Sequence, residues 1–273
     1  MELTYDVFNP ASTAERILVV GPSLGGDATH QWTAVAEALD GQATVVFAGL
    51  PGQASSPVWD DADDATLESL ALGFIDVVRR VRAQVGPLPV FFAGLSISGA
   101  TALHIALNHP DDVSGVAVLC SSAKVGDSDR WLERAELVEN TGTQQLVEET
   151  EKRWFTPNFR AQHRGVVDTI MEGLAGSDHH SYAQLCRALA AHHLRADLAD
   201  IRLPLVVIAG ERDSSTPIEN VELVVETVPD AELHVLADAA HQVTVASPGD
   251  VAVLLLNFMQ RNERPFRKEQ ADD

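Results

Sequence analysis

A short apolar run that ends in a serine turn is the feature that most constrains this chain. Residues 90–95 are apolar or glycine, Ser96 follows them, and apolar residues with helical spacing begin directly after it. Gly94 and Ser98 flank the serine two positions away on either side, in a near match to the pattern G-x-S-x-G with Ser98 in place of the second glycine. A serine on a tight strand-to-helix turn needs such small neighbours. The segment therefore predicts a nucleophile elbow with Ser96 at its tip, and we expect the small side chain of Ser98 to cause little strain there.

The alternation of strand and helix patterns predicts the α/β class. Apolar runs typical of buried strands occupy residues 17–20, 44–47, 89–92, 116–119 and 205–208. Between them, segments such as residues 66–82 repeat apolar positions every three or four residues, which is helical spacing. Buried parallel strands need helices on both faces of their sheet. We therefore expect an α/β fold with a mostly parallel sheet flanked by helices, in one large domain with an insertion.

The alternation stops between residues 123 and 197. This stretch is helical in pattern, charged, and rich in Trp, His and Arg, and the strand signal resumes after Pro204. The sequence thus predicts a helical cap of residues 123–197, inserted into a core that consists of residues 1–122 and 198–273.

The charge and the cysteine content limit the partners and the compartment. The formal net charge of −21 argues against nucleic acid and anionic membranes as partners, because both select basic surfaces. An anionic substrate would need a locally basic pocket. Two cysteines form no framework of spaced pairs, and we expect neither a leader nor a membrane span, so we expect a cytoplasmic location. The sequence leaves homo-oligomerisation open.

Two polar residues follow the last predicted strands. Asp213 comes just after the strand that ends near residue 210, and His241 follows a strand over residues 232–236. A serine hydroxyl becomes an effective nucleophile when an imidazole accepts its proton and a carboxylate holds that imidazole in one tautomer. Singly, each residue also fits a simpler role: Ser96 as an incidental loop serine, Asp213 as a turn or capping residue, and His241 as a structural histidine. Together they predict a catalytic triad.

The glycine-rich segment after the first predicted strand, residues 21–26, is the candidate for one side of an oxyanion hole. Backbone N–H groups of Leu24 and Ile97 would converge on the developing oxyanion. A phosphate-binding loop is the alternative for such a segment. It is excluded because no lysine follows the glycines and the pattern G-x-G-x-x-G is not satisfied.

Several segments carry the motifs of one known family. They are Ser23-Leu24-Gly25 with Asp27 and Trp32, which is similar to S-L-G-x-D…W; residues 94–100, which are similar to the elbow G-L-S-M-G-G; residues 119–124 with Trp131 and Arg134; residues 153–157; and Tyr182 with Cys186. Through nearly its whole length the chain resembles the 3-oxoadipate enol-lactonases of the α/β-hydrolase superfamily. The order Ser96, Asp213, His241 is also the order of that superfamily. The cap segments are the more specific part, because unrelated hydrolases share the triad but not the cap.

The chain departs from the family pattern at several positions. Pro22 stands where asparagine is common, His193 where aspartate is common, and Ala246 where a glutamate follows the histidine. Residues 49–56 replace the family's D-x-R/P-G-H-G-x-S segment. These departures leave the triad intact, so they affect the identity of the substrate rather than hydrolysis itself.

The resemblance implies hydrolysis of 3-oxoadipate enol-lactone to 3-oxoadipate, in the β-ketoadipate pathway of aromatic catabolism. It implies a small-molecule lactone or ester as the partner. Arg134 and Arg153 are the candidates for holding the free carboxylate of that substrate, since a guanidinium can form a bidentate pair with a carboxylate. Their alternative role is pairing with surface glutamates such as Glu133 and Glu151. The expected substrate-binding residues are Ser23, Trp131, Arg134, Arg153 and Trp154.

We expect no metal and no organic cofactor. The pairs His179-His180 and His192-His193 do not predict a zinc site, because adjacent histidines usually point apart and no cysteine or carboxylate pattern completes the ligand set. Two other functions remain open. One is a carboxylesterase or lactonase for a different small acyl group, and the other is a ligand-binding relative without catalysis. A dehalogenase is disfavoured because its nucleophile would be an aspartate.

Overall fold

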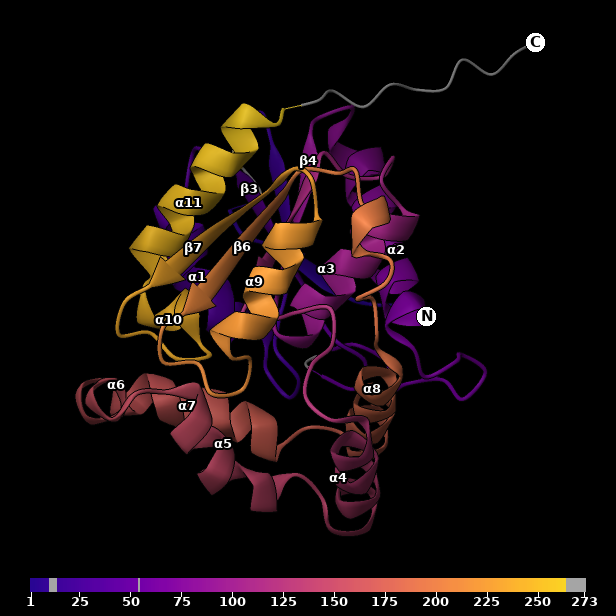
Figure 1. Ribbon diagram of the computed structural model, residues 1–273, viewed down its shortest axis with the longest axis vertical. Coiled ribbons are helices and arrows are strands. Elements are labelled where there is room, and N and C mark those ends of the chain that lie inside the picture. The colour runs from indigo at the N-terminus through magenta and orange to yellow at the C-terminus, as the bar shows by residue number, and fades with distance from the viewer. Residues whose placement is uncertain (10–13, 54, 264–273) are drawn as a thin grey trace.

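A seven-stranded, mostly parallel sheet lies at the centre of the protein, whose computed structural model describes residues 1–9, 14–53 and 55–263 (Figure 1). The strand order is β1-β3-β2-β4-β5-β6-β7, and within the described residues β1 alone is antiparallel to its neighbour. The strands are β1 (Tyr5–Val7), β2 (Ile17–Gly21), β3 (Thr44–Ala48), β4 (Val90–Leu95), β5 (Gly115–Leu119), β6 (Leu205–Gly210) and β7 (Ala231–Leu236). The predicted fold class is confirmed. The sequence did not predict β1, because its three residues include none that is buried and so form no apolar core pattern.

Helices cover both faces of the sheet (Figure 1). Leu18 and Val20 of β2 pack in one core cluster with α1 (Ala28–Ala38) and α11 (Pro248–Arg261). Ile17 and Val19, which point to the opposite face, pack in a second cluster with α2 (Leu67–Val85), α3 (Ile97–Asn108) and α9 (Ile218–Thr227). Burial on both faces explains why the strands read as continuous apolar runs. Across the described residues, no helix combines the length and the apolar character that crossing a bilayer requires.

The chain segment that connects β5 to β6 forms a group of helices, which lies at one end of the sheet (Figure 1). Every residue of this stretch is described, and it contains no strand. Its α-helices are α4 (Ser128–Thr141), α5 (Val147–Trp154), α6 (Pro157–Gln162), α7 (Arg164–Ala175) and α8 (His179–Ala191). The division into a cap of residues 123–197 and a core of residues 1–122 and 198–273 stays a prediction, and residues 10–13, 54 and 264–273 of that core lie outside the described residues.

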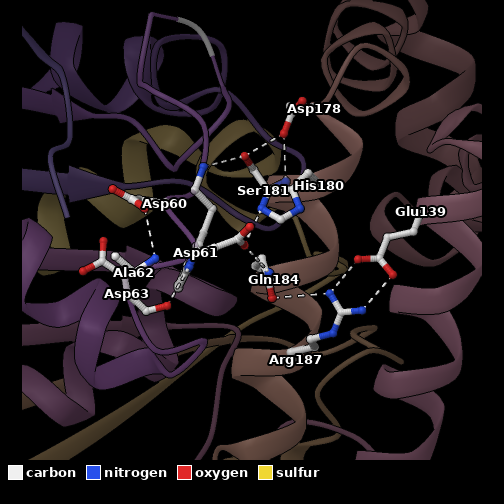
Figure 2. A network of polar contacts seen from close by, with 11 residues as sticks. Asp60, Asp61, Ala62, Asp63, Glu139, Asp178, His180, Ser181, Gln184 and Arg187 are labelled. Carbon is white, nitrogen blue, oxygen red and sulfur yellow. Dashed lines mark hydrogen bonds and ion pairs between the residues drawn. The ribbon is translucent and has the colours of Figure 1, made fainter.

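A polar network joins α8 to the loop between β3 and α2 (Figure 2). The hydroxyl of Ser181 accepts a hydrogen bond from the backbone N–H of Trp59 at 2.9 Å. His180 Nε2 lies 3.0 Å from a carboxylate oxygen of Asp61, which also accepts a hydrogen bond from the amide of Gln184 at 3.1 Å. These contacts join residues about 120 positions apart. They therefore fasten the helical group to the sheet-bearing part of the chain.

A buried histidine makes a second connection at the end of α8. His192 Nε2 lies 2.9 Å from the backbone carbonyl oxygen of Ser122, and its Nδ1 lies 3.2 Å from Nε2 of His104 on α3. Because a carbonyl only accepts hydrogen bonds, His192 Nε2 carries the hydrogen and its neutral Nδ1 accepts one from His104. The pKa of His192 is lowered to about 4, chiefly by burial, with smaller contributions from the neighbouring His104 and His193, and the hydrogen bond to Ser122 opposes this shift.

We expect this histidine to make folding sensitive to acid. In the unfolded chain the pKa of histidine is about 6.5, so the unfolded state binds more protons than the folded state as the pH falls from about 6.5 towards about 4. At the acid end of this range, the free energy of unfolding is lowered by about 3 kcal/mol. Denaturant titrations from about pH 7 to about pH 4.5 should show wild-type protein losing stability faster than His192→Gln, whose amide can still donate to Ser122. Parallel pH profiles of the two proteins would contradict this role.

Candidate active site

Ser96 follows the carboxyl end of the central strand β4, on a strained turn. Ser96 lies between the last residue of β4 and the first of α3, with φ 58° and ψ −113°. Such a conformation costs a residue other than glycine about 1–3 kcal/mol and persists only where its surroundings fix it. The backbone N–H of Ser96 donates to the carbonyl of Leu119 at 2.8 Å. A Cβ on Gly94 would lie 2.0 Å from the carbonyl oxygen of Ser98, which explains the glycine. The turn has the geometry expected of the elbow.

Strands β6 and β7 place a carboxylate and an imidazole beside each other. Asp213 Oδ2 lies 2.8 Å from Nδ1 of His241, and the two side chains are 1% and 3% exposed. The other carboxylate oxygen accepts hydrogen bonds from the backbone N–H groups of Ser215 at 2.8 Å and Thr216 at 3.1 Å. This arrangement fixes the orientation of the imidazole. Because Nδ1 faces the carboxylate, Nε2 is left as the proton acceptor.

Ser96 and His241 open into one cavity of about 460 Å³. Leu24 lines the same cavity, and Ser96 is half-buried there. Asp213 is behind His241, within hydrogen-bond distance of its far nitrogen. The structure thus gathers the three residues of the predicted triad around a cavity of a size that suits a small molecule.

The predicted oxyanion donors lie beside the elbow. Strands β2 and β4 are paired with Gly21 opposite Gly94, so the loop of residues 22–26 begins next to Ser96. Ile97 is the first residue of α3, where a backbone N–H has no partner inside the helix. Leu24 lines the same cavity as Ser96. The two N–H groups therefore come from elements that flank the nucleophile.

Buried side chains hold the oxyanion loop from three directions. The hydroxyl of Ser98 donates to the carbonyl of Pro22 at 2.6 Å. Gln31 on α1 accepts from the backbone N–H of Ser23 at 2.9 Å and donates to its hydroxyl at 2.7 Å. Gln242, the residue after His241, donates to the same hydroxyl at 3.2 Å. These four polar side chains are fully buried, so each bond matters to the position of the loop.

This network corrects one expected role and adds two residues. We expected Ser23 to contact the substrate, but its hydroxyl is occupied by Gln31 and Gln242, and it is not among the residues that line the cavity. Ser23 supports the loop instead. Sequence reasoning missed Gln31 and Gln242, since a single glutamine beside Trp32 or His241 carries no motif.

The cavity that contains Ser96 also has aromatic and cationic lining residues. Trp131, Arg134, Arg153 and Trp154, which the family resemblance predicts as substrate-binding residues, all line it. The guanidinium of Arg134 lies over the rings of Trp131 and Tyr182, at 5.5 and 5.6 Å from their centroids. The hydroxyl of Tyr182 is buried without a hydrogen-bond partner among the described residues. A bound anionic group would provide that partner.

One of the two arginines pairs with a surface glutamate, the alternative role that the sequence left open. Nε of Arg153 lies 3.6 Å from a carboxylate oxygen of the exposed Glu149. Within the described residues, Arg134 forms no ion pair with Glu133, and Glu151 pairs with Arg160 and Arg164. Burial lowers the pKa of Arg153, and the charge of Arg134 lowers it further. The proximity of two like charges favours an anion in the space between them.

Cys120 lies close to the triad without a visible part in its chemistry. Its sulfur, a ligand atom of Asp213 and one of His241 lie within 4.8 Å of one another, and this is the group of potential metal ligands found among the described residues. Burial raises the pKa of the Cys120 thiol well above its usual value, and the charge of Asp213 raises it further. The thiol is thus held in its protonated form, which is a poor metal ligand.

A family model described as serine aminopeptidase, S33, matches residues 62–246. The chain belongs to this family of α/β hydrolases. The matched segment contains Ser96, Asp213 and His241, whereas the oxyanion loop precedes it.

Two curated relatives are similar over different lengths. The 3-oxoadipate enol-lactonase 1 of Acinetobacter baylyi is 29% identical over 243 residues, which cover 89% of this chain and 88% of the relative. The 3-oxoadipate enol-lactonase 2 of the same organism is 32% identical over 157 residues, or 58% of each chain. The predicted resemblance to the enol-lactonases is confirmed.

Solved structures agree with the fold. A hydrolase from Pseudomonas aeruginosa superposes with a TM-score of 0.85 at 26% identity, covering 94% of each chain. The enol-lactonase of Burkholderia xenovorans superposes with a TM-score of 0.84 at 24% identity, covering 94% of this chain and 96% of that one. With these relatives and this fold, the protein is an ester-hydrolysing enzyme of the esterase and lactonase type.

The hydrogen bond of Ser98 changes what we expect from its removal. From the sequence, Ser98→Gly should alter activity little. In the structure, loss of the hydroxyl leaves the buried carbonyl of Pro22 unpaired, at a cost of about 1–3 kcal/mol, and frees one side of the oxyanion loop. We expect both Ser98→Ala and Ser98→Gly to lower kcat by roughly tenfold, with KM nearly unchanged, because the loop acts on the transition state.

Thr143→Val is the matched control for these variants. It also removes a buried hydroxyl that donates to a carbonyl, that of Ala175 at 3.0 Å, but it lies among the cap helices. Thermal unfolding followed by circular dichroism separates lost stability from lost catalysis. Equal kcat values for wild type and the two Ser98 variants would show that Gln31 and Gln242 hold the loop without Ser98.

Proposed function

We propose that the protein hydrolyses an enol-lactone with a free carboxylate, and that this substrate is 3-oxoadipate enol-lactone. The observation that carries the proposal is that Ser96, His241, Arg134 and Arg153 all line one cavity. Such a cavity can hold an anionic group while it exposes a carbonyl to a serine. The enol-lactonases among the relatives support this choice of substrate.

In the first half of the reaction, Ser96 attacks the lactone carbonyl. Nε2 of His241 accepts the hydroxyl proton, and Asp213 stabilises the resulting imidazolium through Nδ1. The N–H groups of Leu24 and Ile97 stabilise the negative charge on the former carbonyl oxygen. Collapse of the tetrahedral intermediate breaks the bond to the ring oxygen.

In the second half, water completes the hydrolysis. The ring oxygen is an enolate leaving group, which is better than a simple alkoxide, and it takes the proton from the His241 imidazolium, so that the enol formed converts to a ketone. Neutral His241 then removes a proton from water, which attacks the acyl group on Ser96, and returns that proton to the serine oxygen as the acyl group leaves. This step releases a dicarboxylate and restores the serine. Ketone formation makes ring opening effectively irreversible.

The free carboxylate binds between Arg134 and Arg153, with the Tyr182 hydroxyl as a further donor. Nε of Arg134 is buried without a hydrogen-bond partner among the described residues, whereas Nε of Arg153 lies 3.6 Å from the carboxylate of Glu149. A substrate carboxylate would balance the charge of Arg134 and provide a partner for its buried donor. We further propose that the reaction belongs to the β-ketoadipate pathway of aromatic catabolism and takes place in the cytoplasm.

The first test is lactone consumption. Purified wild-type protein should remove freshly generated 3-oxoadipate enol-lactone, followed by absorbance, and Ser96→Ala should do so at least about 10³-fold more slowly. A simple aryl acetate assayed in parallel reports on the triad alone. Cleavage of the acetate without lactone turnover would retain the nucleophile but reject the substrate, and would favour an esterase for another acyl group.

The second test concerns the carboxylate site. We expect Arg134→Gln and Arg153→Gln each to raise KM for the lactone by about tenfold to a hundredfold, which corresponds to the loss of a charge-assisted hydrogen bond. The aryl acetate has no carboxylate and should be affected far less. Arg160→Gln is the control, since Arg160 pairs with Glu151 and is not among the residues lining this cavity. An unchanged KM for either cavity variant would remove that arginine from the site.

A further inference from the structure

The cavity that contains Ser96 is basic, although the chain as a whole is acidic. The sequence has 40 Asp and Glu against 19 Lys and Arg. Chance alone would therefore place about two carboxylates beside each cation of a surface. The cavity has the reverse: its charged lining residues, apart from His241, are Lys124, Arg130, Arg134, Arg153, Arg195 and a single acid, Asp127.

Three of these residues, Lys124, Arg130 and Arg195, form what we call the rim cations. Arg130 and Arg195 are exposed and Lys124 is half-buried, so they lie where the cavity meets solvent. Lys124 precedes α4, Arg130 is in its first turn, and Arg195 follows α8. Separate segments of the chain thus bring positive charge to the same opening.

The charge of the rim cations is not neutralised locally. Within residues 1–9, 14–53 and 55–263, none of the three forms an ion pair with a carboxylate, and Arg195 donates to the amide oxygen of Asn220 at 3.4 Å. The carboxylate of Asp127 caps α4 by accepting hydrogen bonds from the backbone N–H groups of residues 129 and 130. Arg130 shares the first turn of α4 with Asp129, and no ion pair joins the two side chains among the described residues.

Salt decides which charges an approaching anion experiences. At about 0.1 M salt the Debye length is about 10 Å, so an anion near the opening interacts with the rim cations while most of the acidic surface is screened. At lower salt the net charge of −21 acts over a longer range and opposes approach.

We propose that the rim cations are an electrostatic entrance that captures anionic acyl substrates and passes them to Arg134 and Arg153. This inference rests on the proposed anionic substrate, but not on the identity of the lactone. Its distinctive consequence is the direction of the salt effect. Added salt should lower kcat/KM for an anionic substrate, whereas the negative net charge of the protein predicts that added salt would raise it.

The experiment compares two aryl esters of equal chain length, a neutral butyrate-type ester and one whose acyl chain ends in a carboxylate. The readout is the ratio of their kcat/KM values, anionic over neutral, between about 0.05 M and about 0.5 M NaCl. For wild-type protein we expect this ratio to fall by roughly tenfold, the lower end of electrostatic steering. For Arg130→Gln/Arg195→Gln the ratio should start roughly tenfold lower and stay flat or rise with salt.

A control variant separates local charge from total charge. Arg79→Gln/Arg261→Gln changes the net charge equally, but Arg79 and Arg261 lie on α2 and α11, are 60% and 54% exposed, and are not among the residues that line the cavity. It should keep the wild-type salt dependence. Calorimetric binding of adipate at the two salt concentrations makes the same comparison without turnover.

The inference is overturned if the wild-type ratio and adipate affinity are unchanged or rise with salt, or if the control variant behaves like the rim variant. Failure of the proposed function is distinguishable from this outcome. If the protein does not hydrolyse the lactone but hydrolyses the anionic ester in a salt-sensitive way, the proposed substrate is rejected and the electrostatic entrance is supported. If it hydrolyses the lactone without salt sensitivity, the proposed substrate is supported and the entrance is rejected.

Discussion

The strained turn at Ser96 is the constraint on which the rest of the site depends. A positive φ at a serine is held by contacts on both sides: the hydrogen bond to Leu119 and the close approach of Gly94 to the backbone of residue 98. The turn exposes the hydroxyl at the carboxyl end of a central strand. Since β2, β5, β6 and β7 run parallel to β4, the segments that follow them reach the same edge of the sheet.

The oxyanion loop shows how a second element is fixed relative to that turn. Two positions at which the chain departs from the family pattern, Pro22 and Ser98, meet in one buried hydrogen bond. Gln31 and Gln242 connect the same loop to α1 and to the segment that carries His241. An unpaired polar group in such a place is costly, so these side chains restrain one another. The nucleophile, the loop and the histidine are thereby positioned by a shared network.

The helices between β5 and β6 supply the chemistry that the sheet does not. The sheet edge provides the serine, the histidine and the carboxylate, which fit the hydrolysis of many esters. Arg134, Arg153 and Trp131 come from the inserted helices and give the cavity its charge and walls. The molecule as a whole is strongly acidic, but this cavity is basic. An anionic ligand in the cavity interacts mainly with the nearby cations, because charges beyond about a Debye length are screened.

By itself, the sequence determined the sheet except for β1, the elbow and the order of the predicted triad residues. Those features depend on local patterns: continuous apolar runs, small residues around a serine, and polar residues at strand ends. It also indicated the aromatic and cationic residues of the cavity through family motifs. Only the tertiary structure decided that Ser23 supports the loop instead of the substrate, that Ser98 holds Pro22, and that Gln31 and Gln242 take part. Such roles depend on hydrogen bonds between residues up to about 220 positions apart, and no local pattern records which buried polar groups will meet.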